Sequence, residues 1–549
     1  MNTISFILGI IFLSAVQVSC HAQTKNDSLK TIESTKKTSP NGDPLDLAVV
    51  TLKGSAVLTL MQNMIKQSPS ITRRLTVKEL DSINTLEKQP AILLEPIGYP
   101  TSIPLTTSLN GFVSGNFGMF TTPNLSFGYG GTTAGYALYG TGKYEQSNGH
   151  ITNADFTTIN ASVKARYMAP EKYLLFGNSI TETNIKYRNS AYALFANDSG
   201  LHRTSSQFMA NVSVKGQSAN IPFTGSVAVQ LLNIKQDLLK TSNDDIAENG
   251  ITGTLKVGGL WSDFNVGISS SVDLRNVKGN AVNFLDLKAY THFIDSSLSI
   301  RIDAGFQAFH SSSNVTRGAF TVKAESDYFL SPNVTLYGLF FTGLSNTSLS
   351  NLLQSNPYVA TNVTIDAART AFKLLGGLQY HPLTSLHGRF EIEFGKLPQM
   401  PIFIQDSISS FLVTYIPVTQ FQIHTDAWYD ITDNDKLMVD FTFTNAVLDN
   451  EVKTPYITPL QVKGAYNKWW SNSLNTNIEA AYIGNRNTST DTSTNLDGYF
   501  LLNLQGTYKL SERLIFNLRF DNLLNSSIFV WKGFRERGAF ASLGLTWQF

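Results

Sequence analysis

Hydrophobic and polar residues alternate with a period of two along much of the chain from about Thr107 to Phe549. In the last stretch, every second residue from Ala541 to Phe549 is apolar, and the residues between them are polar or small. The same alternation recurs at residues 159–167, 298–307, 386–394 and 514–521. Because successive side chains of a strand point to opposite faces, each stretch predicts a strand with one apolar and one polar face.

Short turn signals punctuate these strands at regular intervals. They fall at Gly131, Pro170, Ile221, Ser262, Ser296, Pro332, Thr384, Asp433, Ser471 and Ser511. Each interval is long enough for two strands and one longer connection, so the ten turns predict about 22 strands. We expect long loops at the other end, over residues 189–203, 345–366, 397–417 and 525–537. Short turns at one end and long loops at the other are typical of an outer-membrane barrel.

Composition narrows the class of protein further. Of the 549 residues only 15% are charged, and the formal net charge is +1, which argues against nucleic acid as a partner. No apolar run after the N-terminus is long enough for a membrane-spanning helix. We therefore predict an all-β fold, in which residues 107–549 form a transmembrane antiparallel up-and-down β-barrel.

The N-terminus carries an apolar stretch from Ile4 to Val18 that has the length of a signal-peptide core. Cys20 and Ala22 suit cleavage after Ala22, so residues 1–22 are interpreted as a signal peptide. Lipidation of Cys20 is the alternative, although Gln17 stands where a lipoprotein signal normally has Leu. Cys20 is the only cysteine, so cleavage after Ala22 leaves no disulfide chemistry.

The two faces of the predicted strands supply the candidate functional residues. Tryptophans beside short turns or the C-terminus predict a periplasmic aromatic girdle of Trp261, Trp469, Trp470 and Trp547. Phe549 closes the last strand, where barrels present a terminal aromatic residue to the assembly machinery. Charged residues on the polar face are candidates for the lumen: Lys164, Arg166, Asp286, Lys288, Arg301, Asp303, Arg389, Glu391, Glu393, Arg519 and Asp521.

Both ends of the predicted barrel resemble TonB-dependent receptors. Residues 502–511 are similar to that family's third-last strand and turn, residues 514–525 to the strand before the last, and residues 538–549 to its closing strand. Residues 115–120 and 144–149 resemble its first strands. Arg537-Gly538-Ala539 stands where the family usually has Pro-Gly-Arg. The resemblance implies an outer-membrane barrel that transports a solute.

The segment before the barrel departs from that family. Its members carry a plug of well over a hundred residues, whereas residues 23–106 are fewer and lack the plug's Arg- and Gly-rich strand motifs. We expect a short, partly disordered periplasmic segment there. Residues Asp46, Leu47, Ala48, Val49, Val50 and Thr51 are similar to a TonB box, the strand that pairs with TonB.

No motif for catalysis, a cofactor or a metal rises above background, so we expect no enzyme activity. The two histidines His381 and His387 straddle a turn without further ligands. Our interpretation is an outer-membrane transport protein, and the alternative is a non-conducting barrel that anchors a partner. Expected partners are outer-membrane lipid, the barrel-assembly machinery, and TonB or a surface lipoprotein.

The lumen of a 22-stranded barrel, left empty, would be a large, non-selective hole in the outer membrane, so we expect part of the chain to narrow it. The candidates within the chain are residues 23–106 and the two loops at residues 345–366 and 397–417. The N-terminal segment joins the first strand at its periplasmic end, so we predict that it acts as a partial plug. The expected function is transport of a solute through this partly occluded lumen.

Overall fold

The structure, a computed structural model, describes residues 111–133, 136–170, 177–196, 201–218, 221–238, 242–243, 245–383, 385–407, 409–491 and 494–549. The chain divides into residues 1–51 and residues 52–549, and every described residue belongs to the second unit. The signal peptide, the candidate TonB box and the N-terminal segment predicted as a plug lie outside the described residues.

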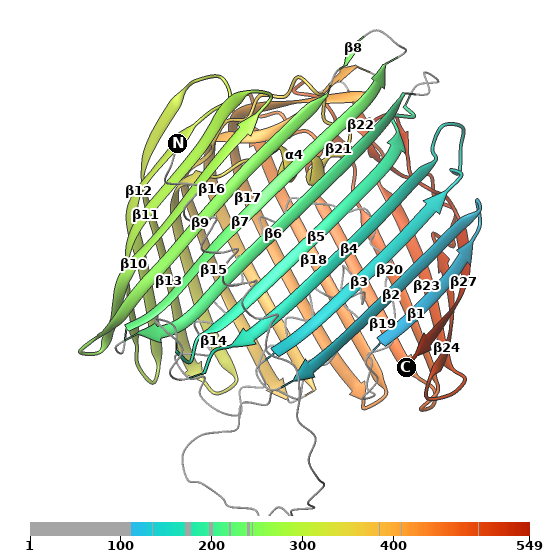
Figure 1. The fold of residues 1–549 in the computed structure, drawn as a ribbon, viewed down its shortest axis with the longest axis horizontal. Helices are drawn as coiled ribbons and strands as arrows, with labels where there is room; N and C mark the ends of the chain where they lie inside the picture. Colours follow the sequence, from blue (N-terminus) through green and yellow to red (C-terminus); the bar gives the residue numbers. More distant parts are fainter. Residues whose placement is uncertain are drawn as a thin grey trace, which may run out of the picture. The chain divides into compact units, whose positions relative to one another are not determined.

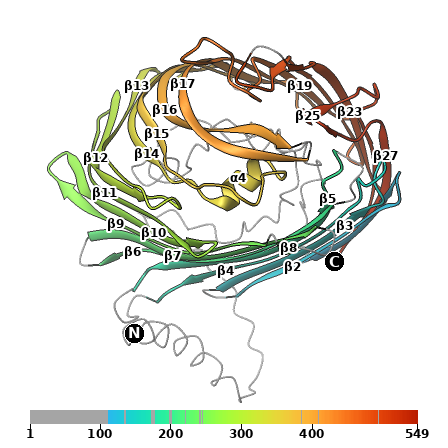
Figure 2. The ribbon, with the colours of Figure 1, turned by 90° about the horizontal axis from the view of Figure 1, so that it is seen from above.

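Within the second unit, 22 antiparallel strands form a closed barrel (Figures 1 and 2). Each strand pairs with its neighbours along the chain, and β1 closes the ring by pairing with β27 from Phe112↔Gln548 to Gly118↔Ser542. The predicted fold class and strand number are therefore confirmed. Closure leaves no unpaired sheet edge, which a membrane barrel requires.

The strands of the barrel are β1 (Gly111–Gly118), β2 (Thr122–Thr133), β3 (Tyr136–Ser147), β4 (Phe156–Met168), β5 (Ile180–Ala193), β6 (His202–Ser218), β7 (Ile221–Leu238), β9 (Ile246–Trp261), β10 (Phe264–Val277), β11 (Asn280–Ile294), β12 (Leu298–His310), β13 (Thr316–Ser331), β14 (Val334–Ser345), β15 (Ala368–Leu383), β16 (Leu386–Ser407), β17 (Ser410–Thr432), β18 (Asp435–Leu448), β19 (Leu460–Trp469), β20 (Leu474–Ile483), β23 (Tyr499–Lys509), β24 (Leu514–Asp521) and β27 (Phe540–Gln548). The connections at one end hold the remaining elements, which are β8 (Ser242–Asn243), α4 (Leu349–Ser355), β21 (Arg486–Asn487), β22 (Asn495–Leu496), β25 (Phe529–Trp531) and β26 (Phe534–Arg535).

The ten predicted turns all connect strands at one end of the barrel, from the β2–β3 connection to the β23–β24 connection. At the other end lie the connections that carry α4, β21–β22 and β25–β26. By the usual asymmetry of outer-membrane barrels, the short turns face the periplasm and the longer loops face outwards. We call these the short-turn end and the loop end.

Two of the four expected long loops are wrong in extent. Residues 397–417 are mostly strand, because β16 continues to Ser407 and β17 begins at Ser410. Residues 189–203 are likewise shortened, since β5 runs to Ala193 and β6 begins at His202. Prolines and polar residues obscured the alternation there, whereas cross-strand hydrogen bonding extends these strands beyond it. Seen from above, the extended β16–β17 hairpin reaches inside the ring (Figure 2).

Within the described residues, no helix is long and apolar enough to cross a membrane.

Candidate functional site

The connection between β14 and β15 folds into the barrel instead of standing out from it. Residues 346–367, which we call the inner loop, carry the helix α4, and α4 lies inside the ring of strands (Figure 2). Ser348 is the N-cap of α4, and its side chain accepts a hydrogen bond from the Asn351 backbone N–H at 3.0 Å. The inner loop thus brings a small ordered element into the lumen at the loop end.

A buried ion cluster on β9 and β10 holds the beginning of the inner loop. Glu248 Oε2 accepts a hydrogen bond from the Ser350 backbone N–H at 3.2 Å, at the first turn of α4. Arg275 pairs with Glu248 and with Asp273, and its Nη1 donates to the Thr347 carbonyl at 3.2 Å. Glu248 and Asp273 are both buried. Because burying an unpaired carboxylate is costly, Arg275 is what allows this anchor to form.

A second buried cation holds the loop after α4. Arg203, on β6, is 1% exposed. Its Nη1 donates to the carbonyls of Pro357 and Val359, both at 2.8 Å, while Gln236 accepts from its other nitrogens. Arg203 therefore fixes the backbone of the inner loop through two of its carbonyl oxygens.

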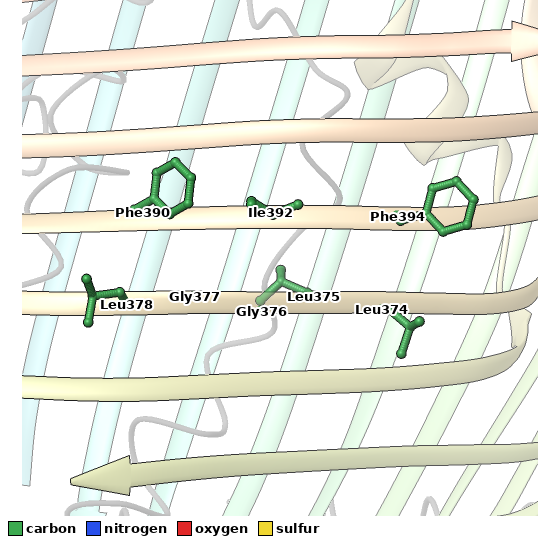
Figure 3. Close-up of a pocket in the computed structure, with 8 residues that line it drawn as sticks. All are labelled: Leu374, Leu375, Gly376, Gly377, Leu378, Phe390, Ile392 and Phe394. Carbon is green, nitrogen blue, oxygen red and sulfur yellow. The ribbon is translucent and has the colours of Figure 1, made fainter. Parts of the chain in front are cut away.

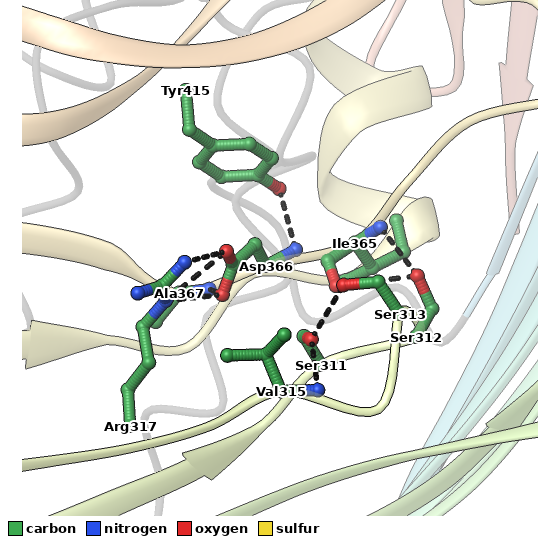
Figure 4. Close-up of polar contacts among 9 residues, drawn as sticks. All are labelled: Ser311, Ser312, Ser313, Val315, Arg317, Ile365, Asp366, Ala367 and Tyr415. Carbon is green, nitrogen blue, oxygen red and sulfur yellow. Dashed lines mark hydrogen bonds and ion pairs between the residues drawn. The ribbon is translucent and has the colours of Figure 1, made fainter.

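The end of the inner loop is tied to β13 and β17 (Figure 4). Arg317 donates to both carboxylate oxygens of Asp366, with distances of 2.8–3.1 Å. Tyr415 accepts from the Asp366 backbone N–H at 3.0 Å, and the Ser312 hydroxyl accepts from the Ile365 N–H at 2.9 Å. The forked Arg–carboxylate pair fixes orientation as well as position. Both ends of the inner loop are thus fastened to the barrel wall.

An apolar core lies between the inner loop and the wall. It joins residues of α4 and the loop to side chains of β7, β9, β10, β11, β12, β14 and the β16–β17 hairpin: Leu232, Ile234, Ile246, Val277, Val282, Phe284, Phe309, Leu344, Leu349, Leu352, Val359, Val363, Ile365, Ala367 and Val413. Burial of this surface stabilises the folded-in position at about 25 cal/mol per Å².

An aromatic cluster joins the inner loop to three other loop-end segments. Tyr358 stacks on Phe534, and Trp531 packs against Phe411 at the tip of the β16–β17 hairpin. Backbone hydrogen bonds connect residues 358 and 360 to Phe411. Burial raises the pKa of the Tyr358 hydroxyl well above its usual value, so this hydroxyl remains neutral. We call the inner loop together with this cluster and the hairpin tip the lid.

Polar contacts with the lid identify the inner face of the strands. Asp273 and Arg275 of β10 touch the inner loop, and Gln207 of β6 donates to Ser350 of α4 at 2.6 Å. Residues directly opposite one another on paired strands share a face. The registers then place the predicted lumen residues on this same face, where those of β11, β12, β16 and β24 each have a partner.

These partners are close. Asp286 pairs with Lys288 at 2.6 Å, Arg301 with Asp303 at 3.0 Å and Arg519 with Asp521 at 2.7 Å. On β16, Arg389 pairs with Asp426 at 2.6 Å, Glu391 accepts from the Tyr337 hydroxyl at 2.8 Å and Glu393 pairs with Lys373 at 2.7 Å. Sequence reasoning named both partners of the pairs within β11, β12 and β24, but it missed Asp426, Tyr337 and Lys373, the partners of β16 on neighbouring strands.

Lys164 and Arg166 have a different setting on β4. Arg166 lies 3.6 Å from Glu182, whereas Lys164 is exposed and has no carboxylate within 4 Å among the described residues. The sequence analysis missed Lys186 and Arg188 on the neighbouring β5, and it also missed the lid anchors Arg203, Glu248 and Arg275. An alternating polar set at residues 182–188 was the available signal for β5.

The opposite face of the strands is apolar and exposed. A groove between β15 and β16 is lined by Leu374, Leu375, Gly376, Gly377, Leu378, Phe390, Ile392 and Phe394 (Figure 3), and the register puts Leu374, Leu378, Phe390, Ile392 and Phe394 on this face. Trp261, Trp470 and Trp547 are exposed at the short-turn end, and Trp469 is half-buried. The Phe549 backbone exchanges two hydrogen bonds with Gly111. A girdle and an assembly signal stay predictions for these residues. A closed barrel with an apolar outer face matches the hydrocarbon core of the outer membrane.

Comparison with known structures agrees with this architecture. The match with the copper transporter OprC covers 82% of this chain and 83% of OprC, with a TM-score of 0.63 and 12% sequence identity. The match with the FrpB iron transporter from Neisseria meningitidis (F5-1 variant) covers 80% of this chain and 82% of FrpB, with a TM-score of 0.64 and 8% sequence identity. The match with a mutant ferric enterobactin receptor (PfeA) from Pseudomonas aeruginosa covers 80% of this chain and 81% of PfeA, with a TM-score of 0.62 and 11% sequence identity.

The fold is that of the TonB-dependent receptor barrels. The sequence itself matches no family model and no curated protein. The three structures of similar fold named above are two transporters and a receptor.

Proposed function

We propose that the protein transports a solute across the outer membrane through the barrel lumen, and that the lid controls passage at the loop end. The observation that carries this proposal is the inner loop. It is fastened to the wall by Arg203, Arg275 and Arg317, yet it crosses a lumen whose inner face is polar. A polar inner face suits a water-filled path through the barrel.

The N-terminal segment, residues 23–106, is proposed to narrow the lumen from the periplasmic side, as its connection to β1 suggests. TonB is proposed as the partner of the candidate box at residues 46–51, because proteins of this fold include TonB-dependent receptors. The lid and the N-terminal segment then act at opposite ends of one path.

Planar-bilayer conductance of the mature protein tests the proposal. Arg203→Ala combined with Arg317→Ala removes two fastenings of the inner loop, so we expect larger or more frequent open-channel currents than in the wild type. Deleting residues 24–95 should raise conductance independently. Arg519→Ala is the matched control, because Arg519 pairs within its own strand with Asp521 at 2.7 Å.

The alternative function is a non-conducting barrel that anchors a surface lipoprotein or another partner. It predicts no current from the wild type, from either lid variant or from the deletion. Equal currents from the Arg203/Arg317 variant and the Arg519 control would instead show that the lid does not gate the path.

A further inference from the structure

The inner wall formed by β4 and β5 differs from the rest of the lumen in its charge. It presents Lys164, Lys186 and Arg188, all of them exposed. Among the described residues, no carboxylate lies within 4 Å of the side-chain nitrogens of these three. Arg188 Nε donates to the Ser190 hydroxyl at 3.3 Å, a neutral group. Glu182, the carboxylate on this face of β5, is paired with Arg166, so these three cations have no paired counter-charge.

Strand register places these cations in the lumen. Arg188 lies directly opposite Gln207, the residue of β6 whose side chain donates to Ser350 of α4. Lys186 is two residues along β5 on the same face, and it lies opposite Ser162 of β4. Lys164 follows Ser162 on that face, two residues nearer the short-turn end. The lid and the three cations therefore face the same space.

The distances between the three cations indicate the size of anion that they can bind. Residues two apart on one face of a strand are separated by about 7 Å. Lys164 lies opposite Asn184, four residues from Arg188, so the row extends about 13 Å along the wall from beneath the lid. Like charges at such distances repel one another, and a bound anion relieves that repulsion.

The other charged wall cannot serve in this way. On β11, β13 and β15, Lys288, Lys323 and Lys373 each have a carboxylate within 3 Å. These pairs are electrically neutral and leave little attraction for a solute. The chain's own N-terminal segment is also a poor counter-charge, because residues 23–106 hold ten Lys or Arg and eight Asp or Glu.

We propose that Lys164, Lys186 and Arg188 form a binding site in the lumen for a multivalent anion, whose carboxylate or phosphate groups follow the row of cations. Asn160, Ser162 and Asn184 on the same face supply hydrogen-bonding groups between the charges. The site rests on the proposed transport function, and it assigns the transported solute to the class of multivalent anions.

Calorimetric titration of the purified mature protein with inorganic tripolyphosphate tests the site. The wild type should show saturable binding that weakens as salt is raised, because salt screens exposed charges. The triple variant Lys164→Gln, Lys186→Gln, Arg188→Gln should bind at least tenfold more weakly. A second triple variant exchanges lysine and arginine and so keeps the three positive charges. This variant, Lys164→Arg, Lys186→Arg, Arg188→Lys, should bind tripolyphosphate as the wild type does.

A matched control separates a local site from overall charge. Lys288→Gln, Lys323→Gln, Lys373→Gln also removes three positive charges, but from the paired wall, and should weaken binding less than threefold. A folded barrel in each variant is checked by its faster gel migration before boiling. Equal weakening in both triple variants, or no saturable binding by the wild type, would overturn the anion site. Wild-type conductance measured beside that result would show whether the transport proposal still stands.

Discussion

The two ends of the barrel use the same residue types for different purposes. At the loop end, Trp531 is 9% exposed and packs among the aromatic rings of the lid. At the short-turn end, Trp261 is 74% exposed beside a tight turn. Arg275 is likewise enclosed between two carboxylates, with its side chain 10% exposed, whereas Lys436 near a short turn is 50% exposed in its pair with Asp430. A tryptophan or an ion pair is therefore structural only where other chain segments enclose it.

The largest expected effect comes from Trp531. Trp531→Ala removes the ring that packs against Phe403, Phe411 and Tyr456, with centroids 4.7–5.2 Å apart. Large-to-small changes at such sites cost about 3–5 kcal/mol. We expect hydrogen exchange to speed up in residues 403–411 and 525–537 while the barrel strands stay protected. Trp261→Ala should leave exchange in these segments unchanged, and equal loss in both variants would contradict the contrast between the ends.

Arg275→Ala tests the buried ion cluster. Removing this cation leaves Glu248 and Asp273 buried without their counter-charge, which costs about 3–5 kcal/mol in comparable pairs. We expect a lower midpoint of urea unfolding and faster exchange in residues 346–356. Lys436→Ala breaks an exposed pair and should cost about 1 kcal/mol at most. A midpoint that Arg275→Ala leaves unaltered would show that the cluster does not hold the inner loop.

The wall between the two ends provides the smallest of these contrasts. Ile302 is 40% exposed on the apolar face of β12, and Ile302→Arg should destabilise the barrel by about 2–4 kcal/mol if it lies near the bilayer centre. Ser271→Arg places the same side chain on the inner face, opposite Asp286, and should cost little. Folded fractions on unboiled gels measure both. Equal losses would mean that the two faces are exchanged.

Strand faces and strand number could be predicted because both depend on local information. Alternation at residues 298–307 fixes which side chains of β12 share a face, whatever the strand packs against. Turn spacing then counts the strands. Prediction failed at residues 397–417, where Pro398 and Pro401 suggested a loop. The structure continues β16 through both prolines: Pro398, which lacks an N–H donor, falls in a shift of register between Leu397 and Met400, while Pro401 stays in register opposite Tyr415.

The candidate site was only partly predictable for a related reason. Lys164 was identified because it alternates with apolar neighbours, but its significance depends on Lys186 and Arg188, and on the absence of carboxylates near them in the described residues. The paired lysines look the same in sequence. Only the register between strands distinguishes a cation with a partner from one without.

By itself, the sequence determined a β-barrel of about 22 strands with a polar inner face, since a period of two and the spacing of turns are properties of neighbouring residues. The tertiary structure decided what lies inside that barrel. Arg203 meets Val359 across 156 residues of chain, and Glu248 meets Ser350 across 102. Contacts of this kind leave no periodic signal, because each depends on where the closed ring brings two distant segments together.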